Sequence, residues 1–192
     1  MTGDAQTVTA LLRAAAADGS LEQELLPTGG SHGMTPLGCA ARNGHHDVAQ
    51  LLLAHMPERQ VLHNSVLGHV PLIIAAQHGH TDLCQLLLQF APEQQLVRAT
   101  DCSCCSDSTA LICAASHGHT EVVKVLLTHI PDRQLLHQNS LGISALHEAT
   151  RCNSAGSVAT LLQYAATQQV HLRAVGGRTA LHVAALLVSV RF

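Results

Sequence analysis

An eleven-residue pattern recurs along this chain at nearly constant spacing. The first copy, Thr35–His45, reads TPLGCAARNGH, and related stretches begin at Val70, Thr109, Ser144 and Thr179. The leucine in the third position returns after steps of 35, 39, 35 and 35 residues, as Leu37, Leu72, Leu111, Leu146 and Leu181. A period of this length predicts a stack of units, each burying its apolar face only on its neighbours. Such a stack offers an extended surface rather than a closed pocket.

Each copy of the pattern predicts a short helix with defined ends. Thr35 can cap a helix that begins at Pro36, where the missing N–H would be unpaired anyway. Gly44 can end that helix in a left-handed conformation. The same place is taken in the later units by Gly79, Gly118 and Asn153. A second helix should follow, because Val48, Leu51, Leu52 and Leu53 have mostly helical spacing.

The recurring pattern resembles the ankyrin repeat motif, T-P-L-H-x-A-A-x-x-G-H. The resemblance covers about Gly33 to Phe192, although the histidine after the anchor leucine is present only as His147 and His182. It implies an all-α solenoid of stacked helix-turn-helix units with hairpin-like loops. We expect repeats at about 33–67, 68–106, 107–141, 142–176 and 177–192, preceded by a degenerate capping unit and connection in 1–32. Within that unit, Leu11–Glu22 looks like a shortened repeat.

A second recurring feature follows each second helix. Proline and an acidic residue stand together at Pro57, Pro92 and Pro131. This pair suits the first turn of a short helix. An additional turn there explains why the period exceeds the roughly 33 residues usual for the family.

The last copy of the pattern differs from the others. Leu186, Leu187 and Val188 stand where the helix-ending glycine should be, and no second helix follows before Phe192. An end repeat normally carries a polar outer face. We therefore expect a fragment or a shortened gene product, with fraying of the last unit or self-association through its uncapped surface.

Composition excludes several classes of function. The formal net charge is −3 and only 12% of residues are charged, which argues against nucleic acid, since that partner requires a basic stripe. No apolar run approaches the roughly 20 residues of a membrane span, and the N-terminus lacks the pattern of a secretory signal. The seven cysteines are interpreted mainly as small packing residues in a reducing, cytoplasmic compartment.

A cysteine-rich insertion, Asp101–Asp107, accounts for the longer repeat step. It contains Cys102, Cys104 and Cys105, and the first and last of these have C-x-x-C spacing. A soft metal or a redox reaction could use such thiols. No second C-x-x-C or paired histidine motif accompanies them, so a tolerated exposed loop is the favoured interpretation.

The fifteen histidines have mainly structural interpretations. His45, His80 and His119 follow the helix-ending position at a helix junction. His78 and His117 should line one face, with Cys152 next in the row, but neighbouring helices pack about 8–10 Å apart, too far for shared metal ligation. No nucleophile elbow, phosphate-binding loop or metalloprotease motif is present, so we expect neither an enzyme nor a cofactor.

The resemblance implies a protein–protein interaction module, as a scaffold or adaptor, that binds a partner protein on its concave face. Family positions at the turn tips correspond to Met34, His69, Ser108, Ile143 and Arg178. Positions on the first helices correspond to Cys39, Arg42, Asn43, Ile74, Gln77, His78, Cys113, Ser116, His117, Glu148, Arg151 and Cys152. The alternative is the targeting part of a longer protein, for example a bacterial effector delivered to a host cell, whose activity lies outside this chain. An enzyme or metal protein that uses the cysteine-rich loop is the third possibility.

Overall fold

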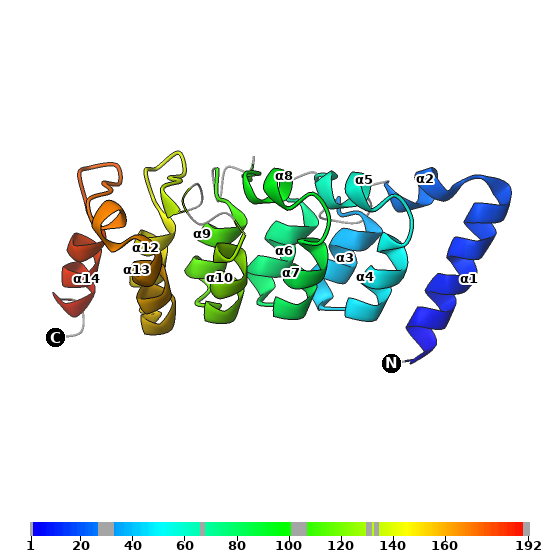
Figure 1. Cartoon of the computed structure of the whole chain (residues 1–192), viewed down its shortest axis with the longest axis horizontal. Coiled ribbons are helices and arrows are strands. Elements are labelled where there is room, and N and C mark those ends of the chain that lie inside the picture. Colours follow the sequence, from blue (N-terminus) through cyan, green and yellow to red (C-terminus); the bar gives the residue numbers. More distant parts are fainter. Residues whose placement is uncertain are drawn as a thin grey trace.

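The chain forms an elongated row of helix pairs (Figure 1). The computed structural model describes residues 2–26, 33–65, 68–100, 107–129, 132 and 135–189. An inner layer consists of α3 (Pro36–Asn43), α6 (Pro71–His78), α9 (Ala110–Ser116), α12 (Ala145–Arg151) and α14 (Ala180–Ser189). An outer layer consists of α4 (His46–Leu53), α7 (Thr81–Leu87), α10 (Thr120–Leu127) and α13 (Ala155–Gln169).

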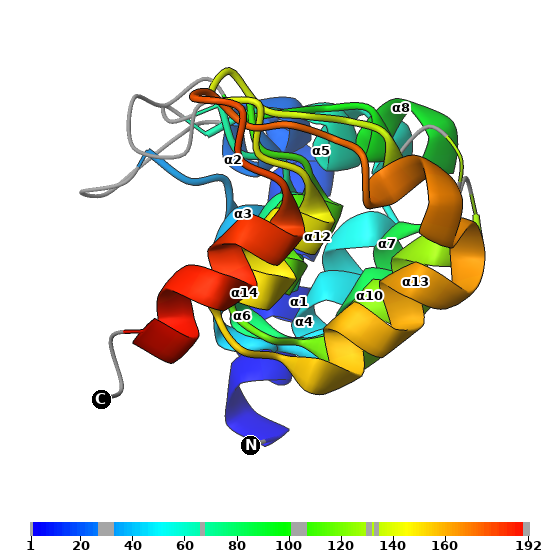
Figure 2. The same ribbon diagram turned by 90° about the vertical axis from the view of Figure 1, so that its left-hand side faces the viewer.

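The two layers are distinct when the row is viewed from one end (Figure 2). Inner helices pack on inner helices, outer helices pack on outer helices, and the two helices of each of the first four repeats pack on each other. Within the described ranges no strand forms, and an isolated bridge joins Ala99 to Thr109. The predicted all-α solenoid of stacked units is confirmed.

The inner helix α3 begins and ends as the motif predicts. Thr35 Oγ1 accepts a hydrogen bond from the Gly38 N–H at 3.1 Å, and Pro36 is the first helical residue. At the other end Gly44 has φ 70°, a left-handed conformation that costs glycine little. Asn153, which replaces glycine in the fourth unit, also has a positive φ, 54°.

The expected short helix after each outer helix is present in the first two repeats, as α5 (Pro57–Leu62) and α8 (Pro92–Leu96). A buried glutamine attaches each one to the outer helix before it. Gln95 Nε2 donates to the carbonyl oxygens of Leu87, at 2.7 Å, and Phe90, at 2.5 Å. Gln60 does the same for Leu52 and His55. In the fourth repeat the outer helix α13 continues to Gln169, whose Nε2 donates to the Leu161 carbonyl at 2.8 Å.

The core lies between the two layers and continues from repeat to repeat. Leu37, Leu72, Leu111 and Leu146 are all buried there. The outer helix α7 buries Leu83, Cys84, Leu86 and Leu87. In α4, by contrast, Val48 and Leu51 are only half-buried. None of the described helices combines the length and apolar character that a membrane span requires.

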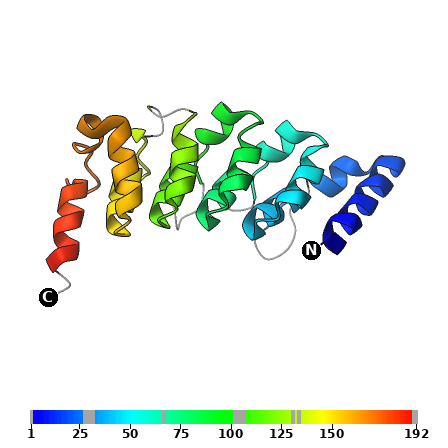
Figure 3. The same cartoon turned by 60° about the horizontal axis from the view of Figure 1, so that its bottom comes forward.

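The N-terminal unit has a different construction from the repeats. It consists of α1 (Thr2–Asp18) and α2 (Leu21–Leu25), so its helix already begins at Thr2 rather than near Leu11. α1 packs on the outer helix α4, and Figure 3 shows it at the end of the row. α2 corresponds to the short helix α5, and an ion pair of 2.5 Å between Glu22 and Arg59 joins them.

Candidate binding surface

The turn tips and the inner helices lie on the same side of the row (Figure 2). Each inner helix places its last residues at equivalent positions along this side. We call the residues implied by the family motif on turn tips and inner helices the inner-helix surface. They are Met34, Cys39, Arg42, Asn43, His69, Ile74, Gln77, His78, Ser108, Cys113, Ser116, His117, Ile143, Glu148, Arg151, Cys152 and Arg178.

These residues differ widely in what they present to solvent. The exposed members are Cys39, Arg42, Asn43, His78, His117, Arg151 and Arg178. The half-buried members are Met34, His69, Gln77, Ser116, Ile143 and Cys152. Ile74, Ser108, Cys113 and Glu148 are buried. The buried four lie against neighbouring parts of the array, so they contribute little direct contact area to any partner.

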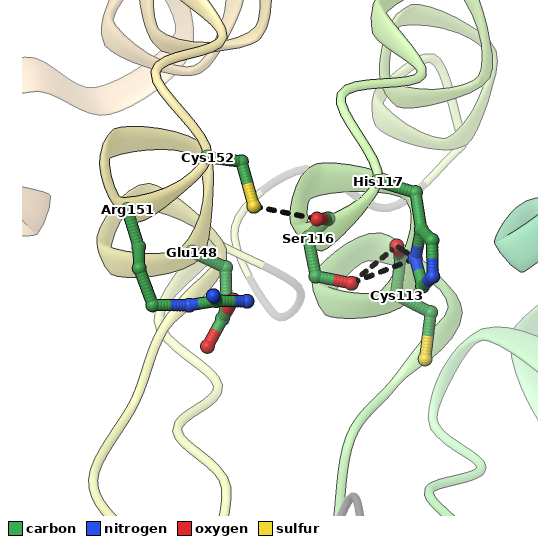
Figure 4. Close-up of polar contacts among 6 residues, drawn as sticks. All are labelled: Cys113, Ser116, His117, Glu148, Arg151 and Cys152. Atoms are coloured by element: carbon green, nitrogen blue, oxygen red, sulfur yellow. Dashed lines mark hydrogen bonds and ion pairs between the residues drawn. The ribbon is translucent and has the colours of Figure 1, made fainter.

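Polar contacts fix the side chains where α9 meets α12 (Figure 4). The Cys152 thiol donates to the Ser116 carbonyl oxygen at 2.6 Å and so joins the third and fourth repeats. The Ser116 hydroxyl donates to the Cys113 carbonyl oxygen at 2.8 Å, and His117 Nδ1 lies 3.0 Å from the same oxygen. Side chains held in this way lose less conformational freedom when a partner binds.

An ion pair within α12 holds the Arg151 guanidinium in place on the inner-helix surface. Arg151 donates through Nη2 at 2.6 Å and through Nε at 2.9 Å to Glu148 Oε2. The hydrogen bonds that Arg151 donates to Glu148 raise the pKa of Arg151 above its ordinary value. The Glu148 side chain is only 11% exposed whereas that of Arg151 is 58% exposed. The pair therefore presents a fixed guanidinium to solvent.

Two histidines connect successive repeats behind this surface. His80 Nε2 lies 3.1 Å from the Arg42 carbonyl oxygen, and His119 Nε2 lies 3.1 Å from the Gln77 carbonyl oxygen. Both bonds satisfy carbonyl groups at the end of the inner helix before them, where no intrahelical partner is available. The motif placed these histidines at helix junctions, but their bonds to the preceding repeat were not predicted.

The histidine rings form two nearly parallel pairs. His78 lies with its ring centroid 6.2 Å from that of His80, and His117 lies 6.0 Å from His119. Burial lowers the pKa of His119, the neighbouring histidine charges lower it further, and the hydrogen bond to Gln77 opposes the change. No three His, Cys, Asp or Glu side chains of the described residues are arranged to hold a metal ion. Cys102, Cys104 and Cys105 lie outside the described residues.

Three buried glutamines are structural residues that the sequence alone did not reveal. Gln60 and Gln95 in the short helices and Gln169 at the end of α13 are each 0% exposed. For the short helices a signal was available, because a glutamine follows the proline by three residues at Pro57, Pro92 and Pro131. The structural role of these glutamines depends on carbonyl groups at the end of the outer helix, and the sequence pattern does not show that those groups lie beside the glutamine.

Helix pairs stacked in a row, with a continuous row of exposed side chains along their inner helices, define a helical repeat protein. A family model for ankyrin repeats in three copies matches residues 57–134, and an ankyrin repeat model matches residues 32–58. Together they span more than half of the 192 residues. The chain belongs to the ankyrin repeat family, whose members are in general protein–protein interaction modules. A comparison with curated proteins gives no match.

Proposed function

We propose that this protein binds a partner protein along the inner-helix surface. The observation that carries the proposal is a row of exposed side chains on four successive inner helices. Asn43, His78 and His117 occupy the same position in three repeats, and Arg151 stands next to that position in the fourth. Helices packed about 8–10 Å apart extend this row over a length suited to a protein surface rather than to a small molecule.

The character of the row supports a polar, directional interface. Its aromatic content is low, so Arg151 is its strongest candidate for a binding anchor, because arginine is enriched among residues that dominate interface energies. Glu148 holds the Arg151 guanidinium in one position, which limits the entropy lost on binding. A carboxylate of the partner is the natural counterpart, since guanidinium groups form paired hydrogen bonds with carboxylates.

On this proposal the surface binds a partner and catalyses no chemical reaction. The protein is proposed to work in a reducing, cytoplasmic compartment. Cys39, Cys84 and Cys152 are not joined in disulfides in the structure, and such thiols persist where disulfides are kept reduced.

Site-specific photocrosslinking tests the proposal. A crosslinking amino acid is placed at Asn43 or His117 on the inner-helix surface, and at Gln50 or Gln85 on the exposed side of the outer helices as matched controls. We expect the inner positions to capture one and the same protein, identified by mass spectrometry, and the outer positions to capture much less of it. Capture from the outer positions alone would contradict the proposal.

A purified partner then allows a quantitative test. Arg151→Glu should weaken its affinity by about tenfold or more, which corresponds to roughly 1.4 kcal/mol, because the substitution places a like charge opposite the partner's carboxylate. Arg98→Glu, at an exposed position after α8, is the control for the change in net charge. Equal effects of the two variants would exclude Arg151 as an anchor.

A further inference from the structure

A mostly apolar groove lies on the inner-helix surface between α12 and α14. Its volume is about 480 Å³, and the turn tips that precede the two helices also border it. The apolar side chains in its wall include Ile143, Val183, Leu186 and Leu187. The wall also contains two arginines, Arg151 and Arg178. A concave apolar site with a few charged groups has the usual composition of a binding site.

The groove does not depend on what lies beyond α14. Its two walls, α12 and α14, pack on each other within the row. Leu186 occupies the motif position that the four earlier repeats fill with Arg42, Gln77, Ser116 and Arg151. Those four residues are exposed or half-buried, although a further inner helix packs beside each of them. A helix packed beyond α14 would therefore leave this side of the row open.

The groove differs in character from the rest of the inner-helix surface. Leu186 is 49% exposed, whereas all its counterparts in the earlier repeats are polar. The turn tips add Leu141 and Val175, which are also exposed. An exposed apolar patch rimmed by charged groups is typical of a surface that binds another protein.

Hydrogen bonds between the two turn tips fix the shape of the groove. The Val175 N–H donates to the Leu141 carbonyl oxygen at 2.9 Å, and Gln138 Nε2 donates to the Arg173 carbonyl oxygen at 3.1 Å. The tips are in close contact, since a Cβ on Gly142 would lie 3.0 Å from the Ala174 Cα. A groove held in this way loses little conformational freedom when it is filled.

The charges at the groove favour a ligand with a carboxylate. Arg151 uses Nε and Nη2 for its bonds to Glu148, which leaves the N–H groups of Nη1 for a ligand. Arg178 is exposed, and it forms no ion pair with any carboxylate of the described residues. The sequence from Ala149 to Phe192 contains no acidic residue. Two guanidinium groups and one carboxylate therefore give the groove a net positive charge.

We propose that this groove binds a segment of the protein partner in which a large apolar side chain stands next to an aspartate or glutamate. The apolar side chain packs against Val183, Leu186 and Leu187. The carboxylate accepts hydrogen bonds from Arg178 and from the remaining donors of Arg151, a geometry that suits guanidinium groups. The inference rests on the proposed function, because it names the chemistry that the inner-helix surface recognises in its partner.

A displayed library of random peptides, selected on the full chain, tests this proposal. The selected peptides should share a leucine, phenylalanine or methionine next to an acidic residue. Selected peptides that lack this pair would overturn the proposal, as would sedimentation showing that a second copy of the chain fills the groove.

One selected peptide with a fluorescent label then allows variants to be compared by fluorescence anisotropy. Leu186→Asp and Arg178→Glu should each weaken its binding by about tenfold or more. Leu181→Asp is the matched control on the same helix, because Leu181 is 73% exposed and does not border the groove. Equal losses in Leu181→Asp and Leu186→Asp would contradict the proposal.

A charge exchange does not depend on how well the apolar variants fold. A peptide with lysine in place of its acidic residue should bind poorly to the wild-type protein and more tightly to Arg178→Glu. A variant damaged in its fold cannot gain affinity in this way. The absence of any gain would overturn the placement of the acidic side chain beside Arg178.

Photocrosslinking of the same peptide separates a failure of this inference from a failure of the proposed function. A crosslinking amino acid at Val175, on the rim of the groove, should capture the peptide. Capture at His117 alone would overturn the inference but leave the inner-helix surface as the binding surface. Capture only at Gln50 or Gln85 of the outer helices would contradict both.

Discussion

Gly79 and His119 belong to successive repeats and fit directly against each other. A Cβ on Gly79 would lie 2.6 Å from His119 Nδ1, and a Cβ on Gly44 would lie 2.6 Å from His80 Nδ1. The glycine of the motif therefore has two functions. It ends its helix with a positive φ, and it leaves room for the histidine of the following repeat.

Gly79→Ala should destabilise the array through both functions. Gly79 has φ +76°, and a left-handed conformation costs alanine roughly 1–2 kcal/mol. The added methyl group must also displace the His119 ring and weaken its bond to Gln77. Gly19→Ala is the control, because Gly19 has φ +79° but no atom within 4 Å of the new Cβ. Urea unfolding should show a larger loss for Gly79→Ala, and equal losses would mean that the ring contact contributes nothing.

Stability should decrease as the pH falls below about 6.5, the ordinary pKa of histidine. Burial lowers the pKa of His119 in the folded state, so the unfolded state binds a proton first as the pH decreases. The contribution of His119 is therefore retained above its unfolded pKa and lost as the pH falls toward its folded pKa. Thermal unfolding between pH 7.5 and pH 5 measures the slope of stability against pH. His119→Gln should flatten it more than His171→Gln, at an exposed histidine, and an unchanged slope in His119→Gln would exclude this histidine as a source.

Gln95→Met should lower the free energy of unfolding. The substitution keeps the volume of the side chain but removes the donors to the Leu87 and Phe90 carbonyl groups. A buried group left without its partner costs about 1–3 kcal/mol, and the loss of the unpartnered Gln95 Oε1 should reduce that figure. Gln94→Met, at the exposed neighbouring position, is the matched control. Chemical unfolding measures the free energy of unfolding of both variants. Equal stability would show that the glutamine does not hold α8 in place.

Cys84 should resist alkylation in the folded protein. Desolvation raises the pKa of its thiol to about 12, and the thiolate is the form that reacts. Cys39 is exposed and provides an internal comparison within the same sample. Iodoacetamide at pH 8 followed by peptide mass analysis should label Cys39 and spare Cys84 until urea is added. Similar labelling of both thiols in the native protein would contradict the burial of Cys84.

The recurring motif allowed much of the repeat architecture to be predicted. The helix start at Thr35 and the helix end at Gly44 follow from local geometry, so one copy of the motif is enough to predict them. The extent of α1 was harder to predict, because Thr2–Asp18 is alanine-rich and carries no repeat motif. Its position against α4 depends on tertiary packing, which sequence periodicity does not encode.

The inner-helix surface was predicted less well than the fold. A motif position identifies which way a residue faces, but not how closely its neighbours cover it. Ile74 and Cys113 are therefore buried, whereas the equivalent Cys39 is exposed because a groove lies beside it. Bonds such as that between Cys152 and Ser116 connect residues of different repeats and have no local signature.

The buried glutamines have a consequence for how the array can change shape. Because Gln60 and Gln95 fasten each short helix to the outer helix before it, we expect these two helices of a repeat to move together as a block. Deformation is then confined to small rotations between blocks, and those rotations add along the row. The array should behave as an elastic strip that can bend to match the curvature of a partner while the side chains within each block keep their arrangement.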